Sequence, residues 1–206
     1  MIKPRRHWLI TPLFSFYIGY IIGRNFQSIN FDRVKLQPGK ATLLIANHFS
    51  WWDGFILYHL NRIYLKKQFR IMVLEDTMRQ IKFFKYLGAF SITKNSKQVV
   101  DSLNYAAGLL NDPANLVVIF PQGKLYSNFV DDVVFEKGVN KITEMATIDF
   151  QYLFAATLTE NLEHKKPTVN VSLKVIQSNE LALAGLSQAY QQHYQSAKQK
   201  QTQIVV

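Results

Sequence analysis

Continuous apolar runs are the feature that most restricts how this 206-residue chain folds. Residues 42–46, TLLIA, show no alternation of polar and apolar side chains, which indicates a short strand covered on both faces. Residues 115–120, NLVVIF, have the same character. Strands buried on both faces are typical of parallel sheets with helices packed against them. We therefore expect such a sheet at the centre of the protein.

Predicted strands and helices alternate through the first two-thirds of the chain. The strands are expected at residues 42–46, 70–74, 89–93, 115–120, 152–158 and 168–175. The helices are expected at residues 54–65, 76–86, 97–110, 139–146 and 181–200. This alternation predicts an α/β fold with a largely parallel sheet and flanking helices.

The chain divides by composition into three parts. Residues 1–34 form a basic and apolar segment, residues 35–180 form the α/β domain, and residues 181–206 form a C-terminal helix with a polar tail. The tail has seven glutamines between residues 187 and 203. It is expected to be a surface helix that frays, without a chemical role.

Positive charge is concentrated at the N-terminus. The net charge of the chain is +10, and residues 1–35 hold six Lys or Arg against one Asp, a net +5. The same segment holds the apolar and aromatic stretch HWLITPLFSFYIGYII. Basic residues beside an aromatic, apolar stretch are typical of a segment that lies in an anionic membrane interface. The stretch is short of the ~20 residues needed to span a bilayer, and it lacks the cleavage site of a signal peptide. A spanning helix and a buried amphipathic helix are the alternatives.

His48 and Asp53 are the first candidate catalytic residues. They lie five positions apart in IANHFSWWDG, between the predicted strand at residues 42–46 and the helix expected from residue 54. Residues five apart face away from each other on a helix or a strand, so the two side chains meet only if the chain turns between them. Ligands bind at the carboxyl ends of strands in open α/β sheets. The alternative is a polar residue at a strand end beside a helix-capping aspartate.

Two further strands end in residues suited to ligand binding. IFPQGK follows the strand at residues 115–120, where Gly123 lets backbone N–H groups approach a ligand and Lys124 adds a cation. LGAFSITK places Lys94 at the end of another strand. In a parallel sheet these ends meet at one edge, together with His48.

Several chemistries are excluded or unsupported. The chain has no cysteine, which excludes a disulfide framework, a thiolate metal site and a cysteine nucleophile. No cluster of histidines and carboxylates has the spacing of a metal site, so no metal is expected. Ser50 is expected to stabilise the turn beside His48 by hydrogen bonding rather than to act as a nucleophile. The tryptophans at positions 51 and 52 suit either an apolar rim for acyl chains or the core.

Four segments in order resemble the sequence blocks of the glycerophospholipid (lysophospholipid) acyltransferase family, over roughly residues 35–180. NHFSWWD resembles the Asn-His-x4-Asp block, and GAFSITK resembles Gly-x-Phe-x-Ile-x-Arg with a lysine in the last place. FPQG is similar to Phe-Pro-Glu-Gly with a glutamine for the glutamate, and FEKGVNKI is similar to a later block. The fourth block of the family is degenerate here, because QYLFAATL has no proline. The resemblance implies catalytic residues His48 and Asp53 and the substrate-binding residues Asn47, Gly88, Phe90, Lys94, Pro121, Gln122, Gly123 and Lys124.

The resemblance also implies a reaction and its partners. The family transfers an acyl group from a thioester to a lipid hydroxyl, without a cofactor other than the donor. His48 would act as general base for the hydroxyl, with Asp53 orienting it. The expected partners are an acyl thioester of CoA or of an acyl carrier protein, a lyso-lipid acceptor, and an anionic membrane surface at the cytoplasmic face, bound peripherally or monotopically. Lysophosphatidic acid is the first choice of acceptor, and a lyso-aminolipid or another hydroxylated lipid is the alternative.

Two other classes of protein compete with this prediction. A pI near 9.7 suits a nucleic-acid-binding domain, but the basic excess gathers beside an apolar stretch instead of interleaving with aromatics on one face. No nucleic-acid partner is therefore expected. A catalytically inactive lipid-binding relative is the other alternative, because Lys94 and Gln122 depart from the family blocks.

Overall fold

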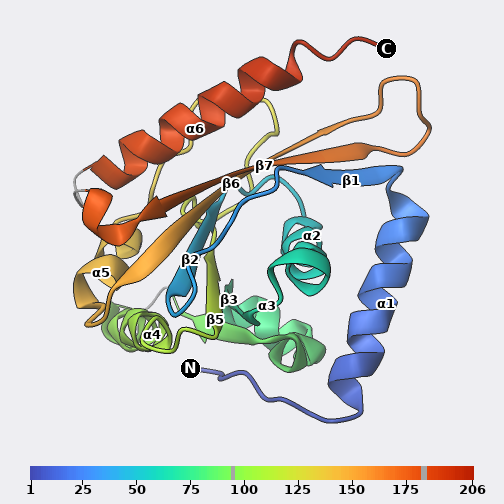
Figure 1. Ribbon diagram of the computed structural model, residues 1–206. Coiled ribbons are helices and arrows are strands. Elements are labelled where there is room, and N and C mark those ends of the chain that lie inside the picture. The colour runs from blue at the N-terminus through green and yellow to red at the C-terminus, as the bar shows by residue number, and fades with distance from the viewer. Residues whose placement is uncertain (94–95, 182–184) are drawn as a thin grey trace.

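The computed structural model describes residues 1–93, 96–181 and 185–206. Its centre is a seven-stranded sheet with the strand order β1-β7-β6-β2-β5-β3-β4. Helices cover both faces of this strongly twisted sheet (Figure 1). The strands are β1 Ser28–Phe31, β2 Ala41–Ala46, β3 Gln68–Leu74, β4 Ala89–Ile92, β5 Asn115–Ile119, β6 Phe150–Glu160 and β7 Thr168–Gln177.

The sheet is mostly parallel. Strands β6, β2, β5, β3 and β4 run in one direction, and β7 pairs with β6 antiparallel. The edge strand β1 pairs with β7 in parallel. Every residue of β2 and β5 is buried, as their continuous apolar sequences predict. The predicted α/β fold class is confirmed.

The helices divide into two groups around the sheet. The helical elements are α1 Ile10–Asn25, α2 Asp53–Leu60, η1 Asn61–Leu65, α3 Glu75–Gln80, η2 Lys82–Leu87, α4 Ser96–Leu109, α5 Gly138–Met145, η3 Ser178–Glu180 and α6 Leu186–Gln201. Helices α1 and α2 pack on one face, where Ile18 and Ile56 meet Leu44 and Leu153. Helices α4, α5 and α6 pack on the other face, where Leu103 and Tyr190 share a core with the strand residues Leu43 and Phe154.

The prediction of one continuous helix at residues 76–86 is wrong, because two separate helical elements occupy this stretch. Helix α3 ends at Gln80, Ile81 has non-helical dihedral angles, and the 3₁₀ helix η2 follows. The break allows the next two aromatic rings to pack inward. Phe83 stacks on Phe14 of α1 with ring centroids 4.4 Å apart, and Phe84 lies against Phe55 of α2. Local helical periodicity does not report such long-range contacts.

The N-terminal segment is built into the domain. Strand β1 lies in a stretch where the sequence analysis expects no strand. The Ile2 carbonyl accepts a hydrogen bond from the Ser91 N–H of β4 at 2.9 Å. Helix α1 buries Ile18 and Ile22, while Leu13, Phe16, Tyr17 and Tyr20 are exposed. The helix is therefore apolar on two opposite faces, of which one packs on the protein. No helix within the described residues has the length and apolarity needed to cross a membrane.

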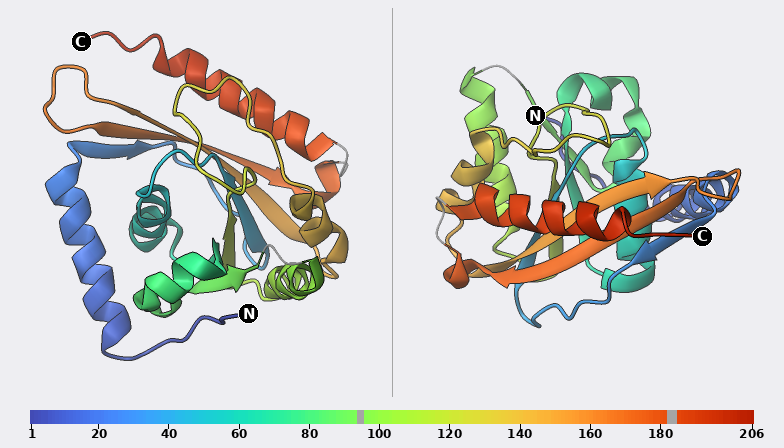
Figure 2. Two further views of the ribbon diagram at one scale, coloured as in Figure 1. Left: turned by 180° about the vertical axis from the view of Figure 1, so that it is seen from behind. Right: turned by 90° about the horizontal axis from the view of Figure 1, so that it is seen from above.

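The C-terminal helix α6 begins later than predicted, at Leu186, and residues 182–184 of the predicted helix lie outside the described part of the chain. Helix α6 lies along β6 and β7 (Figure 2). It buries Tyr190 and Tyr194 completely, so one side of this glutamine-rich helix belongs to the core. The expectation of a loosely attached surface helix is wrong, because the aromatic residues at i and i+4 supply the packing face that the glutamine count conceals.

Candidate active site

His48 and Asp53 meet at the carboxyl end of β2. The chain turns after β2 and enters α2 at Asp53, and His48 Nδ1 lies 2.7 Å from Asp53 Oδ2. The same carboxylate oxygen accepts hydrogen bonds from the Phe49 and Ser50 N–H groups at 2.8 and 2.9 Å. Ser50 Oγ accepts a hydrogen bond from the Trp52 N–H at 3.1 Å. The turn is thus folded around one carboxylate oxygen, which fixes the position of the imidazole.

The buried carboxylate of Asp53 makes all of its hydrogen bonds through one of its two oxygens. Its side chain is 1% exposed. Burial raises the pKa of Asp53 above its ordinary value, and the hydrogen bonds from His48 and the backbone partly offset that rise. The second oxygen, Oδ1, is buried without a hydrogen-bond partner among the described residues. All contacts therefore converge on Oδ2, next to the imidazole that gains a positive charge in acid–base chemistry.

The imidazole of His48 has its second nitrogen available for a substrate. An ionised carboxylate only accepts hydrogen bonds, so Nδ1 carries the proton and Nε2 carries the lone pair. The ring stacks on Phe120 with centroids 4.1 Å apart and 11° between planes. This is the arrangement of a general base oriented by an acid, as in hydrolase triads. The structure places no other side chain in a hydrogen bond with the His48 ring among the described residues.

The segment after β5 packs directly behind His48. Gln122 is 3% exposed, and its Oε1 accepts a hydrogen bond from the His48 N–H at 2.7 Å. Gly123 has φ +65°, and a Cβ there would lie 3.1 Å from Glu136 Cγ. The Tyr126 N–H donates to the His48 carbonyl at 2.9 Å. The two strand ends that the sequence predicts at one sheet edge are therefore joined by one backbone hydrogen bond and by one from the His48 N–H to a side chain.

A large apolar cavity opens beside His48. It has a volume of about 840 Å³ and extends among α2, η2, β3, β4, α4 and α5. Among the residues that line it are His48, Trp51, Phe55, Tyr58, Phe69, Phe84, Leu87, Val99, Leu103, Phe120, Val139 and Ile142. The sequence does not predict this cavity, because its wall combines residues far apart in the chain. A space of this size and polarity suits a hydrocarbon chain.

The predicted substrate-binding residues fall into two groups. Pro121, Gly123 and Lys124 line the cavity together with His48. Lys124 is exposed, and its Nζ lies 5.4 Å from the centroid of the Tyr126 ring. Lys94 lies outside the described residues. The tryptophans separate, since Trp51 lines the cavity whereas Trp52 packs against Phe26.

Asn47, Gly88, Phe90 and Gln122 do not line the cavity. Asn47 exchanges two hydrogen bonds with Thr157 of β6, at 2.8 and 2.9 Å. Phe90 is fully buried on the α4 side of the sheet. Gly88 has φ +94°, and a Cβ there would lie 2.0 Å from the Phe69 carbonyl oxygen. Asn47 and Gln122 hold the strand ends beside His48, whereas Gly88 and Phe90 lie at the start of β4, at the other end of the strands.

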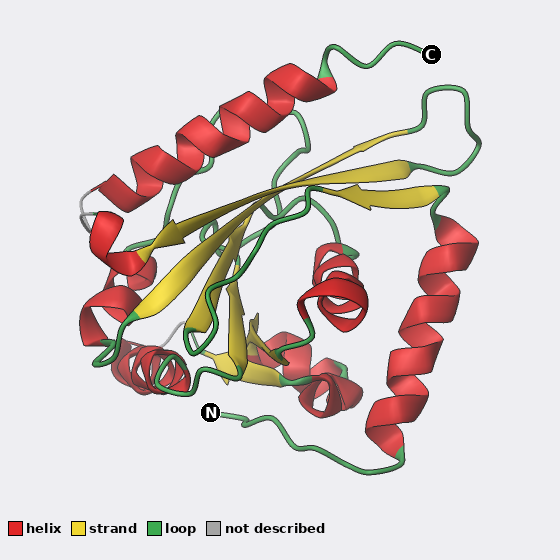
Figure 3. Cartoon of the chain, viewed as in Figure 1, coloured by secondary structure: helices red, strands yellow, loops and turns green. Residues whose placement is uncertain are grey.

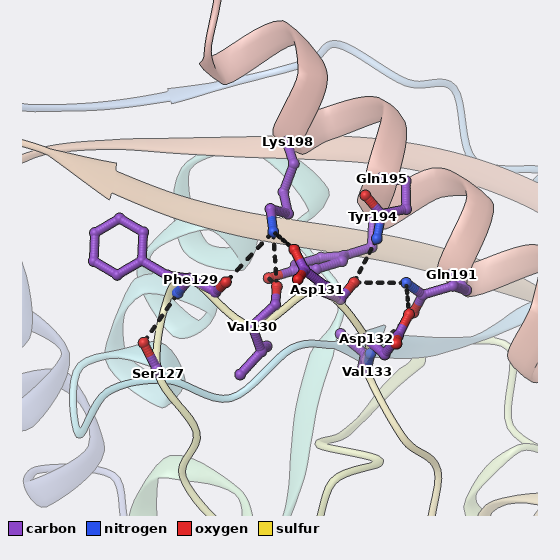
Figure 4. A network of polar contacts seen from close by, with 10 residues as sticks. All are labelled: Ser127, Phe129, Val130, Asp131, Asp132, Val133, Gln191, Tyr194, Gln195 and Lys198. Atoms are coloured by element: carbon purple, nitrogen blue, oxygen red, sulfur yellow. Dashed lines mark hydrogen bonds and ion pairs between the residues drawn. The ribbon is translucent and has the colours of Figure 1, made fainter.

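Helix α6 holds the loop that follows the site, residues 120–137 (Figure 3). Gln191 donates to the Asp131 carbonyl and accepts from the Val133 N–H at 2.9 Å (Figure 4). Lys198 Nζ reaches the Val130 carbonyl and the Asp131 carboxylate, at 2.9 and 2.8 Å. The sequence suggests no such role for the glutamines of α6. Their spacing of three to four residues along one helical face is the signal that would find it.

Fold and site together define a class: an α/β protein with a histidine–aspartate pair beside an apolar cavity. The chain belongs to the Acyltransferase family, whose model matches residues 28–172. This confirms the family predicted from the four sequence blocks.

A solved structure supports the same fold. The crystal structure of the 1-acyl-sn-glycerophosphate (LPA) acyltransferase PlsC from Thermotoga maritima is similar, with a TM-score of 0.69 over 95% of this chain and 81% of that one. At 11% sequence identity the likeness concerns the fold. No curated protein matches this sequence significantly.

Proposed function

We propose that this acyltransferase moves a fatty acyl group from a thioester to the hydroxyl of a lyso-lipid. The observation that carries the proposal is the 2.7 Å contact of His48 and Asp53 at an apolar cavity of about 840 Å³. The cavity would hold the acyl chain, with the reacting carbonyl next to His48. The similar fold of an LPA acyltransferase agrees with this chemistry.

The reaction needs no covalent intermediate on the protein. His48 Nε2 takes the proton of the acceptor hydroxyl, and the oxygen adds to the thioester carbonyl. Asp53 stabilises the resulting imidazolium. Collapse of the tetrahedral intermediate forms the ester and expels a thiolate, which receives the proton from His48. A thiol, with a pKa near ~8.5, leaves readily.

Lysophosphatidic acid is the acceptor that the lysines of the second and third sequence blocks favour. Lys124 lines the cavity near His48, and Lys94 follows β4 in the sequence. Ammonium groups bind a phosphate as point charges. The donor is acyl-CoA or an acyl carrier protein thioester, and the enzyme works at the cytoplasmic face of an anionic membrane, bound peripherally or monotopically.

A lyso-aminolipid is the second candidate acceptor, and Glu136 favours it. The Glu136 carboxylate lines the same cavity beside Gly123, and it would attract an amine and repel a phosphate. The two acceptors therefore predict opposite responses. Replacing Lys124 by methionine raises KM for lysophosphatidic acid, whereas Glu136→Gln lowers it. For an amine-bearing acceptor the two effects are reversed.

The proposal is tested by incubating purified protein with acyl-CoA and a panel of lyso-lipids and identifying products by mass. The variant His48→Ala should lose about 10²–10⁴ in rate, the usual contribution of a general base. Melting temperature is measured on the same samples. Near-normal turnover in folded His48→Ala would refute the mechanism. An unchanged KM for lysophosphatidic acid in both Lys124→Met and Glu136→Gln would refute the phosphate assignment.

A further inference from the structure

A second cavity lies at the opposite edge of the sheet from His48. Phe69 of β3 pairs with Leu116 of β5, and Leu116 pairs with Thr42 near the start of β2. Phe69 therefore lies near the amino ends of these strands, whereas His48 follows the carboxyl end of β2. The cavity, of about 250 Å³, is lined by residues around Phe69, by η1, and by the N-terminal segment. Tyr58, Phe69 and Leu87 line both cavities. Side chains therefore separate the far end of the apolar cavity from this second one.

The second cavity is strongly basic. Arg62 reaches it from η1, Arg70 from β3, and Lys66 and Lys67 from the connection between these two elements. Arg5, Arg6 and Lys85 reach it from the N-terminal segment and η2. No Asp or Glu is among its described lining residues, and none of these cations takes part in an ion pair there. Isolated surface cations are merely solvated, but seven that converge repel one another, and among the described residues only Lys67 is affected by a nearby carboxylate, that of Asp112 outside the lining.

Neutral acceptors fix three of the cations without reducing their charge. Arg62 donates to the Ser15 carbonyl at 3.0 Å, and Arg70 donates to the Gln68 side chain at 2.9 Å. Lys67 donates to two backbone carbonyls, at 2.8 and 2.6 Å. Burial lowers the pKa of Lys67, so a bound anion would favour its charged form. These three side chains are held in place before any ligand arrives.

The backbone at this cavity is also unusual. The π-helix η1 ends at Leu65, and the next residue, Lys66, adopts the left-handed conformation with φ 56° and ψ 30°. Lysine rarely takes this conformation, and π-helical turns occur frequently at functional sites. This backbone brings Arg62 and Lys66 to the same cavity.

We propose that the second cavity binds the phosphate head group of an anionic phospholipid in the membrane on which the enzyme works. The guanidinium and ammonium groups supply the phosphate contacts. The lipid assignment comes from the neighbouring surface, because Trp8 and Leu9, which follow Arg5 and Arg6, are 83% and 58% exposed. Cations beside exposed aromatic and aliphatic side chains match a membrane interface. The inference rests on the proposed membrane association and places lipid binding at the edge away from catalysis.

The test compares two triple variants of the full chain that each remove three positive charges. The cavity variant is Arg5→Gln/Lys66→Asn/Lys85→Gln, in which asparagine tolerates the left-handed conformation. The control is Lys165→Gln/Lys166→Gln/Lys200→Gln, at exposed positions outside the cavity. Partitioning is measured by flotation on phosphatidylcholine vesicles with and without phosphatidylglycerol.

The cavity variant should lose about 100-fold in partitioning on the anionic vesicles, at about fivefold for each cation. The control should change by less than about threefold. Equal losses in both variants would overturn the site in favour of diffuse attraction. If the triple variant does not fold, Lys66→Asn is compared with Lys165→Gln, with an expected loss of about fivefold against none.

Soluble phosphates test the source of the ligand. Inorganic phosphate and CoA should leave the difference in melting temperature between wild type and the cavity variant unchanged. A stabilisation of wild type alone would assign the cavity to a soluble phosphate and overturn the lipid assignment. Vesicle binding requires no turnover, so the lipid site and the proposed function can fail separately. If the wild type transfers no acyl group but the cavity variant still partitions less than the control variant, the proposed function is refuted and the lipid site stands.

Discussion

Asp53 shows how one buried carboxylate serves both folding and chemistry. Burial raises its pKa, so keeping it ionised is a cost to the folded state above that pKa. The unfolded state has the ordinary pKa, so this group favours folding at low pH and loses that contribution as the pH rises through its folded value. Only the contacts at Oδ2, led by that of His48, offset the cost.

We expect Asp53→Asn to separate activity from stability. An asparagine that keeps its oxygen at the Oδ2 position still accepts the backbone hydrogen bonds of the turn and the His48 Nδ1–H, but it carries no charge to stabilise the imidazolium that forms in catalysis. Turnover should fall by about 10²–10⁴-fold, the range for a lost contribution to acid–base catalysis. The melting temperature at pH 7 should not fall, because a buried charge is removed. A variant with normal turnover, or one that loses both properties together, would contradict the assigned role.

Gly88 and Gly108 provide a matched pair of glycine substitutions. A Cβ at Gly88 would overlap the Phe69 carbonyl at 2.0 Å, and φ is +94°, so Gly88→Ala should cost more than ~2 kcal/mol in unfolding free energy. Gly108 lies within α4 with nothing within 4 Å of an added Cβ. Gly108→Ala should therefore stabilise by about 0.5–1 kcal/mol. Urea unfolding measures both, and equal effects would argue against the strained turn at Gly88.

At the scale of elements, α6 and the loop at residues 120–137 depend on each other. Gln191→Leu removes the partner of the partly buried Val133 N–H, so it should destabilise by about 1–3 kcal/mol and lower turnover through the displaced loop. Gln188→Leu on the exposed side of the same helix should stay within about 0.5 kcal/mol. Thermal unfolding and transfer assays test the pair. Equal behaviour of the two variants would mean that α6 does not position the loop.

The attachment of α6 should also depend on pH through His193. Burial, with smaller contributions from Lys174 and Lys200, lowers the pKa of His193, whose Nε2–H donates to the Ser172 carbonyl at 3.0 Å. The unfolded chain binds the proton first as the pH falls, so stability decreases below about pH 6.5. We expect His193→Gln to flatten this dependence of the melting temperature.

Part of that dependence should remain in His193→Gln. The pKa of His59 is lowered as well, first by burial and second by Arg62, so it acts in the same direction. Melting temperatures measured between pH 5 and 7.5 separate the two contributions. A slope identical to that of the wild type would show that His193 does not couple α6 to protonation.

For the whole molecule, the sequence predicts what is local. The buried strands β2 and β5 and the turn from His48 to Asp53 follow from apolar runs and from spacing. The short edge strand β1 is missed because its four residues are half-buried at most and pair with distant β7. The Gln122 contact with the His48 N–H and the wall of the large cavity are missed because each joins residues brought together only by the tertiary fold.

We predict that the exposed apolar face of α1 binds the whole molecule to the membrane surface. Leu9, Leu13, Phe16 and Tyr20 recur at helical spacing on the side opposite the buried Ile18. Removing residues 1–25 would also remove this buried packing, so point substitutions are the sharper test. The variant Leu9→Gln/Leu13→Gln/Phe16→Gln should lose vesicle binding while it keeps the wild-type melting temperature.

A matched control replaces three exposed apolar residues elsewhere, Val134, Ile148 and Val205, by glutamine. Its binding to anionic vesicles should equal that of the wild type, because these side chains do not belong to α1. The α1 variant should lose binding at low and high salt alike, since burying apolar area in the interface does not depend on screening. Equal binding of the wild type and the α1 variant at low salt, with loss of both at high salt, would mean that charge alone holds the protein to the membrane. Binding of the variant that equals the wild type at both salt concentrations would place the membrane surface elsewhere.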